Sequence, residues 1–589
     1  MEEMSDQVRG IIFVIVALLI LFVWQHFYKP PVPVAPPKSP ETSQQIPGNG
    51  STAISTTGGA LTPDGSAKSA SAPASSSISA AANPAVAQAS AEQVVDVQSP
   101  LYHVELSNRG GVVRTWQLNK YFDDQKPPRP LDLVNDSVAE QLGWPFSLVL
   151  NDANQEAAAN SGLYNATVVG AKGATDLSVS GPLTAPVELK FHWSDGHLDV
   201  TKTLKFANDY TVNVAAEVTL DRKPQPVAVA WRGGFGDKAV YNAAQLVTVY
   251  YNSDGKLNLL QYKKLGVSGN QSQPAIQYGP LAFAGIEDQF FTAAFMPDGS
   301  NLSLWHWKQD HTTTVDDKQQ TDPEAQMAAG TTNGGPLAMK VYVGPKDLGI
   351  LEKMHPSLTG LVNFGYMEVI AKPLLWVLQT VHTKLPNWGW CIVVMTLVIN
   401  IALFPLKMKS WRSMQKMQKV GPEIRQIQDR YKKYSMSDPR KKQMNEEVMA
   451  VYSREGINPL GSCIPMLTQM PIWWALWRVL NGAIELRHAP WILWIHDLSA
   501  MDPYYILPIS MTILMFLMTK MTPQTTVDPA QQKMMAFMPL FMGFIFFRFS
   551  SGLNLYMCTS NLVGIGQQYY LNKTEPLPSR GKFKKNNGK

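Results

Sequence analysis

Uncharged polar side chains inside long apolar runs are the feature of this sequence with the clearest chemical meaning. They include Thr396 and Asn400 in the run 388–406, Gln469 in the run 460–480, and Asn561 in the run 553–570. In hydrocarbon, such groups need water or a hydrogen-bond partner. Taken one at a time, such residues more often form hydrogen bonds between packed helices. Taken together, they indicate a hydrated region within a membrane rather than a catalytic centre.

Motifs for enzymatic chemistry are missing from the chain. It has no His-Glu-x-x-His pattern, no phosphate-binding loop and no nucleophile elbow, and no histidine or pair of carboxylates lies inside the apolar runs between residues 388 and 570. The three cysteines, Cys391, Cys463 and Cys558, all fall in apolar runs, which argues against a disulfide framework or thiolate zinc site in the soluble part. We therefore predict no enzyme, cofactor, metal or small-molecule substrate.

The apolar runs themselves predict a polytopic α-helical membrane protein. Five of them form a C-terminal group: 388–406, 460–480, 504–518, 534–547 and 553–570. A span needs about 20 apolar residues to cross roughly 30 Å of hydrocarbon. The run 534–547 has only 14 residues, or about 21 Å of helix, and a short span thins the bilayer around it. A sixth run, 11–28, is too long for a signal peptide and predicts an uncleaved anchor in segment 1–29.

Charge predicts the orientation of these spans. Segment 407–455 has 13 Lys and Arg against 6 Asp and Glu, and the tail 571–589 has 6 against 1. Because basic residues concentrate in cytoplasmic loops, we expect both segments, and with six spans both termini, in the cytoplasm. The basic tail is explained equally well by contact with ribosomal RNA or with anionic lipid.

Between the first two spans lies a region that we expect outside the cytoplasm. Residues 30–92, rich in Pro, Ser and Ala, predict a disordered linker. Residues 93–350 predict an all-β sandwich, since Leu189, Phe191 and Trp193 alternate with polar residues up to a turn at Asp195-Gly196. Residues 360–386 predict an amphipathic helix in the outer interface with a break at Pro373, and packing against the β-domain is the alternative. Segment 407–455 predicts a helical hairpin.

Several motifs in residues 387–570 have a specific and ordered arrangement. They include Asn458-Pro459-Leu460-Gly461, Gln469-Met470-Pro471-Ile472, Trp494-Ile495-His496-Asp497-Leu498, Asp502-Pro503-Tyr504-Tyr505 and Ser560-Asn561-Leu562. Over about 200 residues of the sequence, this core resembles the YidC family of membrane protein insertases. The anchor, linker and β-domain resemble the Gram-negative form of that family in layout.

The resemblance implies an inner-membrane insertase and chaperone that inserts and helps to fold integral membrane proteins through a hydrophilic groove, alone or with the Sec translocon. Its partners would be nascent membrane proteins, lipid, the ribosome and the translocon. Thr396, Asn400, Gln469, Trp473, Met511, Tyr556, Met557 and Asn561 would line the groove. The hairpin would receive clients through Met414, Met417, Tyr431, Met444 and Met449.

One departure from the family pattern bears on the mechanism. Members usually carry an arginine in the first core span, at the position that Asn400 occupies here. We therefore expect the groove to lack a fixed charge while Asn400 keeps it hydrated. The alternative function, a secondary transporter, would need ion-coordinating groups near the midplane and internal repeats, and the five core spans show neither.

Overall fold

The computed structural model describes residues 86–170, 173–176, 181–237, 247–266, 274–299, 301–315, 318–362, 364–434, 438–457, 464–522 and 529–574. The predicted anchor, most of the predicted linker and nearly all of the basic tail lie outside these residues.

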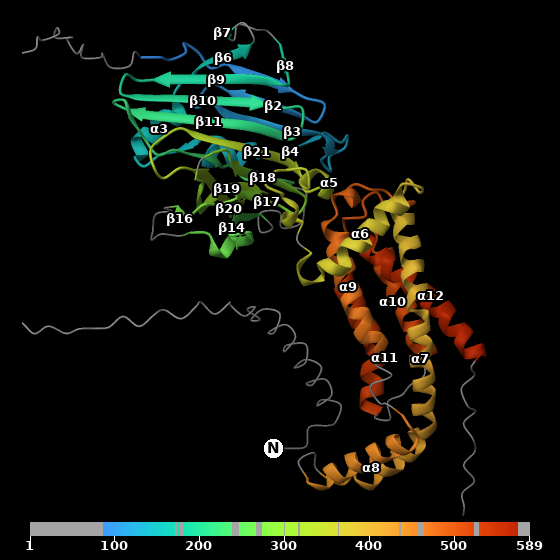
Figure 1. The fold of residues 1–589 in the computed structure, drawn as a ribbon. Coiled ribbons are helices and arrows are strands. Elements are labelled where there is room, and N and C mark those ends of the chain that lie inside the picture. The colour runs from blue at the N-terminus through green and yellow to red at the C-terminus, as the bar shows by residue number, and fades with distance from the viewer. Residues whose placement is uncertain are drawn as a thin grey trace, which may run out of the picture. The chain divides into compact units, whose positions relative to one another are not determined.

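The first half of the described chain is a β-domain made of three sheets (Figure 1). The first sheet has the order β4 (Pro130–Asp132), β3 (Val112–Phe122), β2 (Tyr102–Ser107), β1 (Val94–Gln98), β8 (Leu183–Thr184). The largest has the order β15 (Lys256–Gln261), β14 (Thr248–Ser253), β17 (Phe283–Glu287), β18 (Phe291–Pro297), β21 (Leu337–Pro345), β11 (Thr211–Leu220), β10 (Leu198–Phe206), β9 (Val187–Ser194), β6 (Asn165–Gly170), β7 (Gly173–Asp176), with β12 (Lys223–Pro224) beside β11. The third has the order β16 (Ala275–Gln277), β19 (Ser303–Val315), β20 (Lys318–Gly330), β13 (Ala228–Trp231), β5 (Leu148–Val149).

The predicted hairpin at Asp195-Gly196 is confirmed. β9 and β10 pair antiparallel with Trp193 opposite Val200. The Asp195 carboxylate accepts from the backbone N–H groups of His197 and Leu198, and Gly196 takes a positive φ of 95°, which glycine adopts without steric cost. Local alternation and turn chemistry together fix this register.

One hydrophobic core joins the sheets of the β-domain. Trp116, Phe146, Phe206 and Trp231 are fully buried and pack at ring-centroid distances of 6.2–6.5 Å. Short helical elements border the sheets: α2 (Asp136–Leu142), α3 (Ala153–Ser161), η1 (Tyr262–Lys264), α5 (Leu348–Leu351) and η2 (Thr359–Leu361). These aromatic contacts hold the largest core of the β-rich domain together, and its description as a sandwich stays a prediction.

The second half of the described chain is helical (Figure 1). Its elements are η3 (Gly365–Met367), α6 (Glu368–His382), α7 (Trp388–Arg430), α8 (Arg440–Arg454), α9 (Ile464–Gly482), η5 (Ile484–Leu486), α10 (Ile506–Met521), α11 (Pro529–Phe546) and α12 (Ser551–Thr574). A second apolar core holds α6, α7, α9, α10 and α12 together, with Leu375, Met395, Val479, Met511 and Tyr556 among its buried members.

Helix α7 continues well past the end of the predicted span 388–406. It runs unbroken for 43 residues through Pro405 and Pro422, so that the span and the first arm of the predicted hairpin are one helix. Val420, Ile424 and Ile427 of this arm pack with Val451 of α8 in a small separate core. Each proline removes one backbone hydrogen bond, and side-chain packing on both sides of it keeps the helix continuous.

By length and composition, α7 is the one described helix that is long and apolar enough to cross a membrane. Two shorter apolar helices, Ile506–Met521 and Met534–Phe546, lie among the described residues. The count of six spans stays a prediction, since the predicted anchor run 11–28 and the first residues of run 460–480 are outside the described part of the chain.

The predicted break at Pro373 is wrong. Helix α6 continues through this residue from Glu368 to His382. Because proline has no backbone N–H, residue 373 cannot donate to the carbonyl oxygen of Val369, so the helix loses one hydrogen bond near its start. The buried face formed by Ala371, Leu375 and Leu378 packs into the helical core and holds the remaining turns.

Candidate functional site

Asn400 lies in a polar cluster, defined here as Asn400, Lys407, Ser560 and Gln567, which links α7 to α12. The Asn400 side chain is buried, and its Nδ2 donates to the Thr396 carbonyl oxygen at 2.9 Å and to Ser560 Oγ at 3.3 Å. Gln567 Nε2 donates to the Asn400 carbonyl oxygen at 3.1 Å. The two predicted residues on α7, Thr396 and Asn400, therefore lie together, one turn apart.

Lys407 brings a positive charge into this cluster. Its Nζ donates to Asn400 Oδ1 at 2.8 Å and to Gln567 Oε1 at 3.0 Å. The expectation that the region around Asn400 lacks a fixed charge is therefore wrong. A side chain on a helix leans toward the N-terminus of that helix, which lets a lysine two turns after Asn400 reach back to it.

The predicted residues on α9 and α12 form the next polar contacts. Gln469 Nε2 donates to the Tyr556 hydroxyl at 3.0 Å, and Ser560 also interacts with that hydroxyl. Asn561 is half-buried, and its Nδ2 has no partner among the described residues. Polar contacts thus run from Gln469 through Tyr556 and Ser560 to the polar cluster.

The remaining predicted site residues lie in apolar surroundings. Met511 is fully buried in the helical core, while Trp473 and Met557 are partly buried against it. The Trp473 ring packs on Phe546 at 6.3 Å, and its Nε1 has no partner in the described part of the chain. These three side chains border the polar contacts rather than belong to them.

The predicted client-receiving residues are divided between the interior and the surface of the α7–α8 hairpin. Met417 is buried, and Met414, Tyr431 and Met444 are half-buried. The Tyr431 hydroxyl donates to Glu447 at 2.7 Å. Met449 is 54% exposed, so it is the methionine of this group that is most available for contact.

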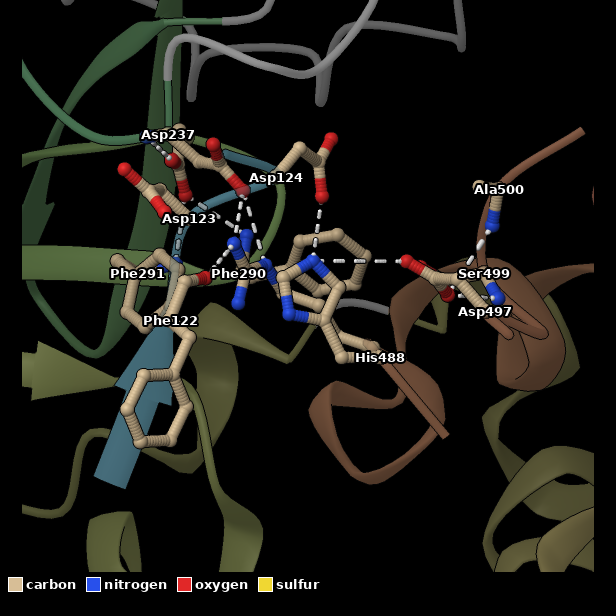
Figure 2. Close-up of polar contacts among 12 residues, drawn as sticks. Phe122, Asp123, Asp124, Asp237, Phe290, Phe291, His488, Asp497, Ser499 and Ala500 are labelled. Carbon is tan, nitrogen blue, oxygen red and sulfur yellow. Dashed lines mark hydrogen bonds and ion pairs between the residues drawn. The ribbon is translucent and has the colours of Figure 1, made fainter. Parts of the chain in front are cut away.

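A second set of polar contacts joins the β-domain to the segment that follows α9 (Figure 2). Arg487 Nε donates to Asp237 Oδ2 at 2.9 Å, and Arg487 Nη2 donates to the Phe122 carbonyl oxygen at 2.8 Å. The arginine and aspartate side chains are only 3% and 4% exposed. In addition, Ile484 of η5 belongs to the hydrophobic core of the β-domain. This segment therefore holds the helical part of the chain against the β-domain.

Next to this ion pair, His488 lies between two carboxylates, as Figure 2 shows. His488 Nε2 is 2.6 Å from Asp124 Oδ1 and 3.8 Å from Asp497 Oδ2. Asp497 Oδ1 accepts from the backbone N–H and the hydroxyl of Ser499. The three groups are of metal-binding types, but the contacts already made are those of an ordinary histidine–carboxylate pair. They border a cavity of about 1040 Å³ that Arg478 and Arg548 also line.

Lys407, Gln567 and the Arg487–Asp237 pair were not predicted from the sequence. For the first two a signal was present, because Lys407 follows Asn400 by seven residues and Gln567 follows Ser560 by seven. That spacing is two helical turns and places both members of each pair on one face. The Arg487–Asp237 contact joins residues 250 positions apart and leaves no local signal.

Comparisons with known proteins match the whole chain. A family model described as "YidC periplasmic domain" matches residues 94–377 and one described as "60Kd inner membrane protein" matches residues 380–578. The chain is 31% identical to "Membrane protein insertase YidC" of Wolinella succinogenes, with 100% of this chain and 98% of that protein covered. The protein of the same name from Syntrophus aciditrophicus is 30% identical, with 96% and 99% covered.

A solved structure titled "Active YidC insertase crystal structure with the first transmembrane domain resolved" matches 83% of this chain and 95% of that chain. Its sequence identity is 18% and its TM-score is 0.34.

Proposed function

This chain belongs to the YidC family of membrane protein insertases, and on that premise we propose that its polar cluster receives the polar flank of a client during insertion. The chain is an inner-membrane insertase with a periplasmic domain, and its substrates are nascent membrane proteins. The sequence prediction of family and function is confirmed. Full-length similarity to proteins named as insertases is the observation that carries this conclusion.

The proposed mechanism follows from the cost of moving polar groups through hydrocarbon. Each unsatisfied polar group costs several kcal/mol in an apolar medium. Asn400, Ser560, Gln567 and Gln469 offer donors and acceptors along the path, and they would accept the client's polar flank in place of water. No nucleotide hydrolysis is needed, since burial of the client's apolar span is itself favourable by about 25 cal/mol per Å².

The client path in this proposal combines polar and apolar residues. Thr396, Asn400, Gln469, Tyr556 and Asn561 would contact the polar flank, while Trp473, Met511 and Met557 border the apolar span. The buried state of Met511 requires that α10 and α12 separate slightly when a client enters. Exposed Met449 on α8 would be an early contact for the client.

The proposed topology has six spans, with both termini in the cytoplasm and the β-domain in the periplasm. The basic balance of residues 407–455 and 571–589 supports this orientation. The same basic segments would lie beside the translating ribosome, and the Sec translocon is a further proposed partner.

Photocrosslinking of the full-length protein tests this path. A photoreactive residue is placed at position 396, 400, 473, 511 or 557 during synthesis of a short single-span client. The control position is Trp376 on α6, which is 65% exposed and outside the proposed path. We expect client crosslinks from several of the five positions and none from position 376. Crosslinks confined to the α7–α8 hairpin would contradict the proposed path.

A further inference from the structure

Lys407 differs from an ordinary basic residue at the end of a membrane-spanning segment. A lysine in that place normally extends its ammonium toward water and the lipid headgroups. Here the ammonium points back along α7 and contacts the side chains of Asn400 and Gln567. Its side chain is half-buried, so the charge is held next to the polar cluster instead of in bulk solvent.

The two partners of this ammonium are neutral amide oxygens. They satisfy hydrogen bonds but do not cancel the positive charge. An ammonium has three N–H donors, and two of them are used in these contacts. The described residues include no carboxylate in an ion pair with Lys407. One donor and one full charge are therefore available to a ligand.

The surrounding helices carry no acidic residue that could neutralise it. The sequences of α9, α10, α11 and α12 contain neither Asp nor Glu, and the first acidic residue on α7 is Glu423. Glu423 follows Lys407 by 16 residues, or about 24 Å of helix. A charge with low-dielectric surroundings and no counter-ion attracts an anionic group more strongly than the same charge in water.

We propose that Lys407 is the anion-recognition residue of the insertase, held in place by Asn400 and Gln567, and that it binds carboxylates in the polar flank of a client. This inference rests on the proposed function. It assigns the preference for acidic clients to Lys407. This lysine lies two helical turns after Asn400, the position at which family members usually carry an arginine. Asn400 in this chain then has a positioning role, since it directs the lysine toward the polar cluster.

The test uses full-length protein in vesicles and two single-span clients that differ only in their translocated flank. One flank contains Asp and Glu, and the other has Asn and Gln at the same positions. We expect Lys407→Gln to slow insertion of the acidic client by about tenfold, the size expected for loss of one charge-assisted hydrogen bond. The neutral client should change by less than about twofold, within the range of a neutral hydrogen bond. Lys407→Arg should preserve most of the difference in insertion rate between the acidic and the neutral client.

Two further variants separate charge from structure. Lys409→Gln removes the same charge from an exposed residue on the same helix, and it should not affect either client selectively. Asn400→Arg in the Lys407→Gln background returns a cation to the cluster and should restore the preference for the acidic client. High salt should reduce that preference in the wild-type protein.

The alternative outcomes have distinct meanings. Equal slowing of both clients by Lys407→Gln would overturn the proposal and leave the lysine a structural role. Lys407→Gln could instead slow insertion of both clients equally, and only in vesicles that contain anionic lipid. That result would show that Lys407 contacts lipid headgroups, and it would also overturn the proposal. Failure of the wild-type protein to insert even the neutral client would count against the proposed function itself.

Discussion

At the scale of single residues, a half-buried and a fully buried lysine show how surroundings decide the role of a charge. Lys407 is half-buried beside neutral amides and has a donor left over. Lys202 on β10 is fully buried, and its Nζ donates to the carbonyl oxygens of Gly110, Gly111 and Phe146. When the amine is protonated, all three of its donors are used, so Lys202 links β10 to the backbone at Gly110, Gly111 and Phe146 and has no donor left for a ligand.

Lys202 predicts an unusual pH dependence of stability. Burial lowers its pKa from 10.5 to about 7. Between these two values the unfolded chain binds a proton that the folded β-domain lacks, so stability should rise with pH, by at most about 1.4 kcal/mol per unit. Thermal unfolding of the purified full-length protein from pH 7 to 9.5 checks this. Lys202→Met should flatten the profile, and a wild-type profile that falls with rising pH would contradict the assignment.

At the scale of elements, the segment after α9 is held to the β-domain by a buried ion pair. Replacing Arg487 or Asp237 alone by Ala leaves a buried charge without its partner, and we expect a loss of about 3–5 kcal/mol. The double variant Arg487→Met with Asp237→Leu should recover part of that loss, because it leaves no charge behind. Thermal unfolding of the wild-type protein, the two alanine variants and the double variant compares their stabilities.

A matched control lies in the α7–α8 hairpin. The Arg454–Glu423 ion pair has side chains that are 58% and 42% exposed, and Arg454→Ala should lower stability far less than loss of either member of the buried pair, because solvent screens an exposed pair. If Arg487→Ala costs as little as this control, the buried pair does not fasten the β-domain to the helices.

Elements also show what a sequence can and cannot reveal. The β9–β10 hairpin was predictable because alternation and an Asp-Gly turn are both local signals. Thr396 and Asn400 lie one helical turn apart, while their place in a client path stays a prediction. The continuity of α7 through Pro405 was not predicted, because packing overrides the local effect of a proline. The Arg487–Asp237 contact depends on how two distant segments fold together, which no spacing rule reveals.

At the scale of the whole molecule, the lengths of the apolar helices relate the protein to its bilayer. Helix α10 has 16 residues, or about 24 Å along its axis, against a hydrocarbon thickness of roughly 30 Å. The apolar part of α11, Met534–Phe546, is shorter still. A bilayer around these helices should therefore thin locally, which shortens the dry path that a client's flank must cross.

Vesicles of increasing acyl-chain length test this relation. Because mismatch costs a fraction of a kcal/mol per Å, a hydrocarbon core about 6 Å thicker should lower the insertion rate on the order of tenfold. The client's span is lengthened in parallel, so that only the insertase is mismatched. Crosslinking of the client to Met449 on α8 should stay constant, since that contact precedes entry. Insertion rates that do not change with thickness would show that thinning around α10 and α11 is no part of the mechanism.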